Sequence, residues 1–441
     1  MTKEDLIKKK ISAVSLGCDK NRVDLEHILS SLEQYGFTVV PQIEDAEIII
    51  VNTCAFIKPA ILEAVDNISY ALEQKIIGKA EKIIVSGCFP QRDLKSLQEN
   101  FPEVDKFLMV SENEKICNVI EELYSSQRTN FCPEKTSRLL TNEGKYAYLK
   151  ISDGCSNGCA YCTIPRIRGR FKSVPMKDLI KEAKQLGKMG YKELILVAQD
   201  TARYGEDIYG EIKLIDLLKE LVKIKEIEWI RLQYIYPEWL SDELLDYINT
   251  EEKMCKYIDM PLQHIDDEIL RSMNRKTGEE KSRQIVDKIK LKYPNFTLRT
   301  TFIIGLPGET NEKFRKLLDF VAEEKIDYAS FFIFYREENT KAYYMKKQVW
   351  EFVKKKRLKQ IEKLQNLIMN KQNLGKIGSV EEVLIDSFDQ NQKKFIGHSK
   401  NNSPNVDLYV IIEEDQQIKI GEIYKVKLTQ TIDGGFKGEI V

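Results

Sequence analysis

Short apolar runs alternate with amphipathic stretches in the N-terminal part of the chain. Residues 11–14, 47–51 and 82–85 have the length and composition of buried strands. Between them, residues 21–34 and 58–74 carry apolar side chains at helical spacing. Strands that alternate with helices predict a parallel sheet. The chain is therefore expected to begin with an α/β domain.

The alternation continues through the middle of the chain and changes near its end. Further strands are predicted at 146–151, 194–197, 229–232, 257–259, 297–304 and 328–334, and further helices at 175–189, 212–224, 241–249, 278–293 and 310–323. Six parallel β/α units predict a partial TIM barrel, with its site at the C-terminal ends of the strands. After a long charged helix at 349–372, short strands with turn signals predict a small β-barrel or sandwich.

These patterns predict an α/β fold of three domains. An N-terminal parallel-sheet domain is expected at 9–126, a central partial (β/α)6 TIM-like barrel at 141–371, and a small all-β domain at 374–441. A length of 441 residues agrees with about three domains.

Composition narrows the class of protein. The net charge of −1 provides no general attraction to nucleic acid or to anionic membranes. No apolar run approaches the roughly 18 residues that span a bilayer, and the polar, lysine-rich start lacks the apolar segment of a signal peptide. Nine cysteines in such a chain favour metal ligands and free thiols over disulfides. We expect a cytoplasmic protein without a membrane partner.

Three cysteines lie close together at Cys155, Cys159 and Cys162, separated by three residues and then by two. Structural zinc sites use four ligands, commonly in matched pairs, and no histidine is near in sequence to provide the fourth. Thiolates at this spacing are typical of iron–sulfur clusters, which normally take four ligands. A cluster held by three would leave one iron free for a substrate or cofactor. The alternative is a structural zinc knuckle with a distant fourth cysteine.

Three more cysteines, Cys18, Cys54 and Cys88, each follow a predicted strand of the first domain. In a parallel sheet, ligands gather beyond the carboxyl ends of the strands, so these three side chains are expected to meet. The alternative is three structural cysteines, because free cysteine is among the most buried residue types. A second cluster with an open iron is the sharper hypothesis. The other three cysteines, at 117, 132 and 255, are interpreted as free thiols.

The Cys155 loop resembles the signature of the radical S-adenosylmethionine superfamily, and the whole layout resembles its methylthiotransferases. The resemblance implies two 4Fe-4S clusters, held by the two cysteine trios, and a C-terminal TRAM-like domain. It also implies two uses of S-adenosylmethionine: one molecule methylates a sulfur on the N-terminal cluster, and another yields the radical that abstracts hydrogen from the substrate. A sulfur donor and an electron donor such as flavodoxin or ferredoxin are implied as partners.

Several segments are similar to the branch that modifies an aspartate of ribosomal protein S12. These are LGCDKNRVD at 16–24, AQDT at 198–201, MPLQH at 260–264 and SPNVD at 403–407. The chain departs from that branch at Asp19, Leu25 and Leu408. Residues 373–441 contain eight lysines and no arginine against eleven acidic residues, a net charge of −3, which suits a basic protein better than tRNA. The alternative is a tRNA methylthiotransferase that acts on a modified adenosine near the anticodon.

Five other positions are candidates for binding the cofactor. Tyr161 resembles the aromatic residue that borders the adenine. Gln199 and Asp200 end the second barrel strand, where the resemblance places them near the methionine end of the cofactor. Arg299 could bind the cofactor carboxylate or cap the barrel. Gly305 belongs to a glycine motif, GLPG at 305–308, that permits close approach of the backbone.

Overall fold

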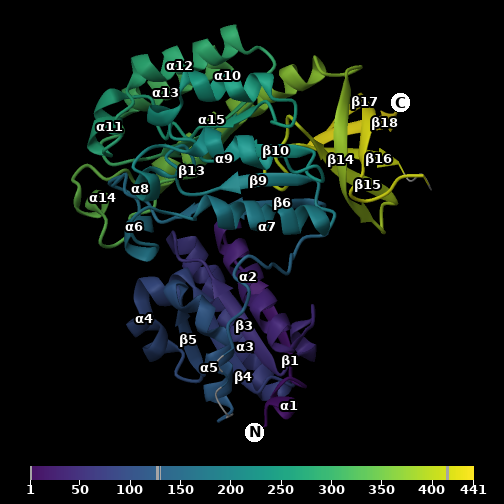
Figure 1. The fold of residues 1–441 in the computed structure, drawn as a ribbon. Helices are drawn as coiled ribbons and strands as arrows, with labels where there is room; N and C mark the ends of the chain where they lie inside the picture. The colour runs from purple at the N-terminus through teal and green to yellow at the C-terminus, as the bar shows by residue number, and fades with distance from the viewer. Residues whose placement is uncertain (1, 126–128, 130, 414–416) are drawn as a thin grey trace.

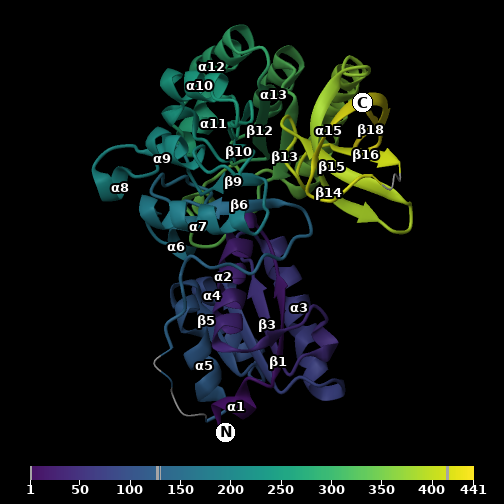
Figure 2. The ribbon, with the colours of Figure 1, turned by 45° about the vertical axis from the view of Figure 1, so that its right-hand side comes forward.

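The computed structural model describes residues 2–125, 129, 131–413 and 417–441. The purple and blue N-terminal domain lies below the teal and green barrel, and the yellow C-terminal domain lies beside the barrel (Figures 1 and 2). Residue 126, the predicted end of the first domain, lies outside the described residues. The exact domain limits therefore stay predictions.

The N-terminal domain is built on a parallel five-stranded sheet in the order β2-β1-β3-β4-β5. Its strands are β1 (Lys10–Ser15), β2 (Thr38–Val39), β3 (Ile48–Thr53), β4 (Lys82–Gly87) and β5 (Lys106–Met109). Because β3 is buried along its whole length, its apolar side chains fill cores on both faces. The helices are α1 (Lys3–Leu6), α2 (Asp19–Tyr35), α3 (Lys58–Ile77), α4 (Cys88–Asn100) and α5 (Ile116–Leu123). The core on one face includes residues of α1, α2 and α5, and the core on the other includes residues of α3 and α4.

Six parallel strands form the central open barrel. They are β6 (Tyr146–Lys150), β9 (Glu193–Val197), β10 (Trp229–Leu232), β11 (Tyr257–Asp259), β12 (Thr297–Ile304) and β13 (Tyr328–Ile333). The strands pair as β10-β9-β6 and β11-β12-β13, and a bridge between Ile230 and Met254 joins the two halves. A two-stranded hairpin, β7 (Ser152–Asp153) with β8 (Lys172–Ser173), brackets the Cys155 loop.

Helices cover the outside of the barrel, as the alternation predicts (Figure 1). The helices of this domain are α6 (Ile164–Ile167), α7 (Met176–Lys188), α8 (Glu206–Tyr209), α9 (Leu214–Leu221), α10 (Asp242–Thr250), α11 (Asp267–Ser272), α12 (Glu279–Lys292), α13 (Asn311–Glu324), α14 (Lys341–Tyr344) and α15 (Glu351–Leu374). A hydrophobic core joins the strands to α7, α9, α10, α12, α13 and α15. Within the described part of the chain, none of the helices has both the length and the apolar character needed to cross a membrane.

The C-terminal domain is a closed barrel in the order β14-β15-β16-β18-β17. Its strands are β14 (Val380–Asp389), β15 (Lys394–Ser399), β16 (Tyr409–Glu413), β17 (Ile423–Ile432) and β18 (Gly435–Ile440). The α/β sheet, the open barrel and this small β-barrel confirm the predicted fold class.

A buried charged network joins the C-terminal domain to the first residues of the barrel strands. His398 contacts Glu193 at 2.5 Å and Asp386 at 2.7 Å, and Arg231 donates to Glu193 at 2.7 Å. The two carboxylates raise the pKa of His398 to about 9 against the opposing effect of burial. The imidazole is therefore a cation in this junction at neutral pH.

Candidate active site

The Cys155 loop leaves the barrel after β6 and is closed by the β7–β8 hairpin. Gly154 has φ +68°, and a Cβ on it would lie 2.2 Å from the carbonyl oxygen of Arg170, so the loop requires glycine there. Cys155 donates its N–H to the carbonyl of Gly169 at 3.1 Å, and Cys162 donates to Cys159 at 3.1 Å. Burial raises the pKa of Cys155, and it raises that of Cys162 to about 12. The loop thus gathers three largely dry thiols at the end of the first barrel strand.

The N-terminal trio lies at the carboxyl edge of the sheet, where neighbouring strands β1, β3 and β4 end. Cys18 is the N-cap of α2 and Cys88 is the first residue of α4, so both sulfurs lie at helix N-termini, where negative charge is favoured. A Cβ on Gly17 would lie 2.4 Å from the Cβ of Cys54, which shows how closely these loops pack. Burial is the main cause of the raised pKa of Cys54 and Cys88, and interactions among the three cysteines add to it.

The two trios face the same interface between the domains. Thr163, the residue after Cys162, donates its hydroxyl at 3.0 Å to the carbonyl of Phe56, which is two residues after Cys54. From the other side, Arg168 donates Nη2–H to the sulfur of Cys88 at 3.5 Å. The loops that carry the two trios are therefore in direct contact.

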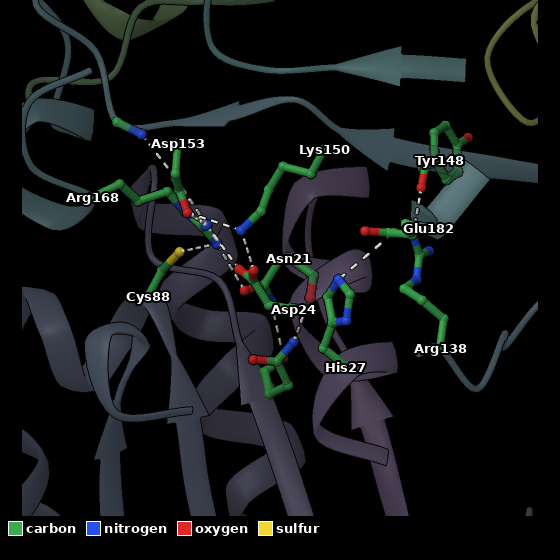
Figure 3. Close-up of polar contacts among 12 residues, drawn as sticks. Asn21, Asp24, His27, Cys88, Arg138, Tyr148, Lys150, Asp153, Arg168 and Glu182 are labelled. Atoms are coloured by element: carbon green, nitrogen blue, oxygen red, sulfur yellow. Dashed lines mark hydrogen bonds and ion pairs between the residues drawn. The ribbon is translucent and has the colours of Figure 1, made fainter. Parts of the chain in front are cut away.

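Buried ion pairs hold this interface together, and Figure 3 shows Asp24 of α2 between two cations of the barrel domain. Asp24 forms ion pairs with Lys150 and, at 2.8 Å, with Arg168. Asp153 contacts the same two cations at 2.9 and 3.0 Å. These two cations lower the pKa of Asp153 and keep it ionised despite its partial burial. The four charges fix the Cys155 loop against the helix that begins at Cys18.

A second buried cluster lies further along α2. Arg138 forms ion pairs with Glu26 and, at 2.8 Å, with Glu182 of α7, and it donates to the carbonyl of Tyr148 at 2.6 Å (Figure 3). Glu26 also accepts the N–H and hydroxyl of Thr141 at 3.0 and 2.9 Å. The segment between the domains is thus locked to both of them.

Helix α2 closes the open side of the barrel. Tyr146 and Tyr148 point away from the outer helices and pack with Val23 of α2 in a separate hydrophobic cluster. Lys20, in the first turn of α2, places its ammonium 3.3 Å from the centroid of the Tyr234 ring, after β10. The N-terminal end of α2, next to Cys18, therefore lies against the inner face of the barrel.

Sequence comparisons agree with this architecture. The pattern of the Radical SAM superfamily matches residues 149–321, that of the uncharacterized protein family UPF0004 matches 10–109, and that of the TRAM domain matches 377–441. "Ribosomal protein uS12 methylthiotransferase RimO" of Elusimicrobium minutum (strain Pei191) is 42% identical over 98% of this chain and 100% of its own length. The protein of the same name from Thermoanaerobacter sp. (strain X514) is 39% identical over the same shares.

The chain belongs to the ribosomal protein uS12 methylthiotransferase family. Among solved structures, the radical S-adenosylmethionine methyltransferase TsrM from Kitasatospora setae has a TM-score of 0.55 at 13% identity, over 74% of this chain and 73% of its own. The cobalamin-dependent enzyme OxsB has a TM-score of 0.51 at 14% identity, over 83% of this chain and 57% of its own. These two likenesses concern the fold alone.

Membership of a radical S-adenosylmethionine family implies a 4Fe-4S cluster and S-adenosylmethionine, and the donor atoms fit both. Within the described ranges, no three His, Cys, Asp or Glu side chains are arranged to hold a single metal ion. An iron–sulfur cluster requires a different arrangement of ligands, because each thiolate binds a separate iron of the cluster. Beside the Cys155 loop, Gln199 Oε1 and Asp200 Oδ1 are buried without a hydrogen-bond partner among the described residues, as expected where a polar ligand completes the site.

The other predicted cofactor residues are placed as follows. Burial raises the pKa of Asp200 to about 6, and its other oxygen accepts from Asn157 of the Cys155 loop at 2.9 Å. Tyr161, which is part of that loop, packs against a small cluster of buried apolar side chains. Gly305 follows β12 and donates its N–H to Glu309 at 2.8 Å. The roles of these residues toward the cofactor stay predictions.

Arg299 lies near the start of β12, on the side of the C-terminal domain. Its guanidinium contacts Asp259 at 3.3 Å, Asp407 at 3.2 Å and the hydroxyl of Ser330 at 3.1 Å. The sequence offered a cofactor contact or a barrel cap for this residue. Each of its three guanidinium nitrogens has a protein partner, and its role toward the cofactor stays a prediction.

The sequence did not single out Arg275, which lies beside the Cys155 trio. Its guanidinium lies 4.1 Å from the centroid of the Tyr236 ring, and the hydroxyl of Tyr236 contacts the sulfur of Cys159 at 3.0 Å. Arg275 is buried, and its Nε and Nη1 have no hydrogen-bond partner in the part of the chain that the structure describes. The sequence around it, LRSMNRKTG at 270–278, has no hydrophobic periodicity that would distinguish a buried arginine from a solvated one. The Nε and Nη1 of Arg275 are therefore donors that a ligand beside the Cys155 trio could use.

Proposed function

We propose that this protein transfers a methylthio group to the β-carbon of an aspartate in ribosomal protein uS12. The proposal uses two 4Fe-4S clusters, one on Cys18, Cys54 and Cys88 and one on the Cys155 trio. It also uses two molecules of S-adenosylmethionine, one as methyl donor and one as radical source. The observation that carries it is the meeting of both trios at one interface, in a chain of the uS12 methylthiotransferase family.

The chemistry explains why a cofactor is needed. An unactivated C–H bond offers no route by acid or base, so bound S-adenosylmethionine and its cluster would supply the radical. The chain itself contributes position and dryness. Gln199 and Asp200 offer unpartnered oxygens to the amino group of the cofactor, and Arg275 offers its free N–H donors to the carboxylate.

The protein also has to keep water and wrong partners away from a radical. Helix α2 covers the inner face of the barrel, where its Val23 packs with Tyr146 and Tyr148 of β6, and all three side chains are buried. The ion pairs of Asp24 and Asp153 hold the two loops at a fixed separation. A substrate side chain that enters between the trios would therefore meet both in one dry chamber.

The first experiment measures iron and sulfide in anaerobically prepared protein. Two four-iron clusters predict about eight irons per chain. We expect about half of this iron after Cys18→Ala and, separately, after Cys155→Ala. Cys132→Ala is the matched control, because this thiol is exposed and belongs to neither trio. A parent protein with only about four irons would refute the two-cluster proposal.

The second experiment identifies the substrate. Purified ribosomal protein uS12, small ribosomal subunits and unmodified tRNA are each incubated with the reduced enzyme, and the products are analysed by mass spectrometry. We expect methylthiolation of the ribosomal protein and none of tRNA, with Cys155→Ala inactive on both. Modification of tRNA alone would establish the alternative substrate. The proposal places the reaction in the cytoplasm, with a separate sulfur donor and with flavodoxin or ferredoxin as electron donor.

A further inference from the structure

Lys20 is a buried cation that forms no ion pair with any acidic side chain among the described residues. Lys20 is only 6% exposed, and its ammonium lies over the ring of Tyr234. Asp24 lies one helical turn further along α2. Among the described residues, its carboxylate pairs with Lys150 and Arg168 and not with Lys20. Asp19, the acidic residue next to Lys20 in sequence, acts on it electrostatically, but no ion pair between the two is formed.

The other buried cations of this interface are neutralised. Lys150 and Arg168 share two aspartates, and Arg138 lies between two glutamates. Removing an ammonium from water without an anion is costly, and an aromatic ring compensates for only part of that cost. Lys20 is therefore arranged as if its counter-charge arrives with a ligand.

The position of the ammonium is set from both sides. Cys18, two residues earlier, belongs to the N-terminal trio and fixes the start of α2. Tyr234 has φ +60° and is held by two hydrogen bonds of 3.1 Å, from its N–H to Asp259 and from the N–H of Thr201 to its carbonyl. The charge thus lies between the N-terminal trio and the C-terminal ends of the barrel strands, where a substrate side chain would have to enter.

We propose that Lys20 binds the side-chain carboxylate of the aspartate that is modified, and thereby selects an acidic side chain as substrate. The inference rests on the proposed function and deepens it. The β-carbon of aspartate is bonded directly to its carboxylate carbon, so a hydrogen bond from the ammonium fixes the position of the C–H bond that reacts. An adenosine offers no carboxylate to this lysine, so the same contact discriminates between the two substrate classes.

One other carboxylate could reach this cation, namely that of S-adenosylmethionine. The two sources are separated by measuring binding of each ligand. Ribosomal protein uS12 is prepared with its natural aspartate and with asparagine at the modified position, and both forms are titrated anaerobically against the iron-loaded enzyme by fluorescence anisotropy. S-adenosylmethionine binding and iron content are measured in parallel. The variants are Lys20→Met, Lys20→Arg and, as a control, Lys188→Met, which changes an exposed lysine at the end of α7.

A charge-assisted hydrogen bond predicts that the parent enzyme binds the aspartate form roughly 10- to 100-fold more tightly than the asparagine form. Lys20→Met is expected to abolish this preference while iron content and S-adenosylmethionine affinity stay at the parent values. Lys20→Arg is expected to keep part of the preference, and Lys188→Met all of it.

Three results would overturn the inference. A parent enzyme that modifies the ribosomal protein but binds both forms equally excludes this role, whatever the folding of the variants. A Lys20→Met enzyme that keeps the preference but loses S-adenosylmethionine affinity assigns the lysine to the cofactor. A variant that keeps the preference but loses iron assigns it to the N-terminal trio. If the parent binds neither form and modifies tRNA instead, the proposed function itself fails.

Discussion

Arg138 offers a direct test of how the two domains are held together. It is the cation between Glu26 of α2 and Glu182 of α7, and the side chains of Arg138 and Glu26 are each only 1% exposed. Arg138→Met keeps much of the volume of the side chain but leaves two carboxylates without their shared counter-charge. Breaking a buried pair by removing one partner costs about 3–5 kcal/mol. The interface between α2 and the barrel should weaken by this amount.

Hydrogen–deuterium exchange under anaerobic conditions measures the change locally. A free-energy change of about 1.4 kcal/mol alters an equilibrium constant tenfold. Amides of α2 and β6 that exchange through opening of this interface should therefore exchange at least roughly 100-fold faster in Arg138→Met. Amides of α13, on the outside of the barrel, serve as the internal reference. Arg166→Met, which changes an exposed arginine near the same interface, should leave all of these rates unchanged.

A second variant separates the charge effect from lost packing. In Arg138→Met combined with Glu26→Gln, no charge is left unpaired at position 26, and the glutamine oxygen can still accept from Thr141. We expect this double variant to recover most of the protection that Arg138→Met loses. If Arg138→Met exchanges less than about tenfold faster than the parent, or if the double variant recovers nothing, the account of this buried pair is wrong.

Three further predictions follow from single contacts. Gly17→Ala should lose about half the iron, because its methyl group would lie 2.4 Å from the Cβ of Cys54; Gly190→Ala, with the same φ of +86° and no atom within 4 Å, should keep it. His398→Gln should lower the thermal midpoint at pH 6. The pKa of His398 is higher in the folded protein than in the unfolded chain, so its protonation stabilises the fold at a pH below the ordinary histidine pKa. This stabilisation is lost as the pH rises through about 9, and the difference in thermal midpoint should vanish with it. Arg168→Gln should lower the reduction potential of the N-terminal cluster in a redox titration, and Arg168→Lys should lower it less. Both variants remove the guanidinium that donates to the sulfur of Cys88, but only glutamine also removes the positive charge. An unchanged potential in Arg168→Gln would contradict this role.

The local pattern of the chain was enough to predict the architecture and the six cysteines proposed as ligands. Apolar runs report which segments are buried, and parallel strands bring their carboxyl ends to one edge. Cys18, Cys54 and Cys88 could therefore be grouped although they are far apart in sequence. Likewise, the close spacing of Cys155, Cys159 and Cys162 predicts a shared site without any knowledge of the fold.

What covers a given face could be decided only by the tertiary structure. Asp24 and Glu26 look like ordinary solvated charges in the sequence, and they are buried because α2 closes the barrel. The sequence likewise could not show that Arg299 lies beside Asp407, 108 residues later. Periodicity describes the burial of one segment, whereas the counter-charge of a buried ion comes from whichever distant segment packs there.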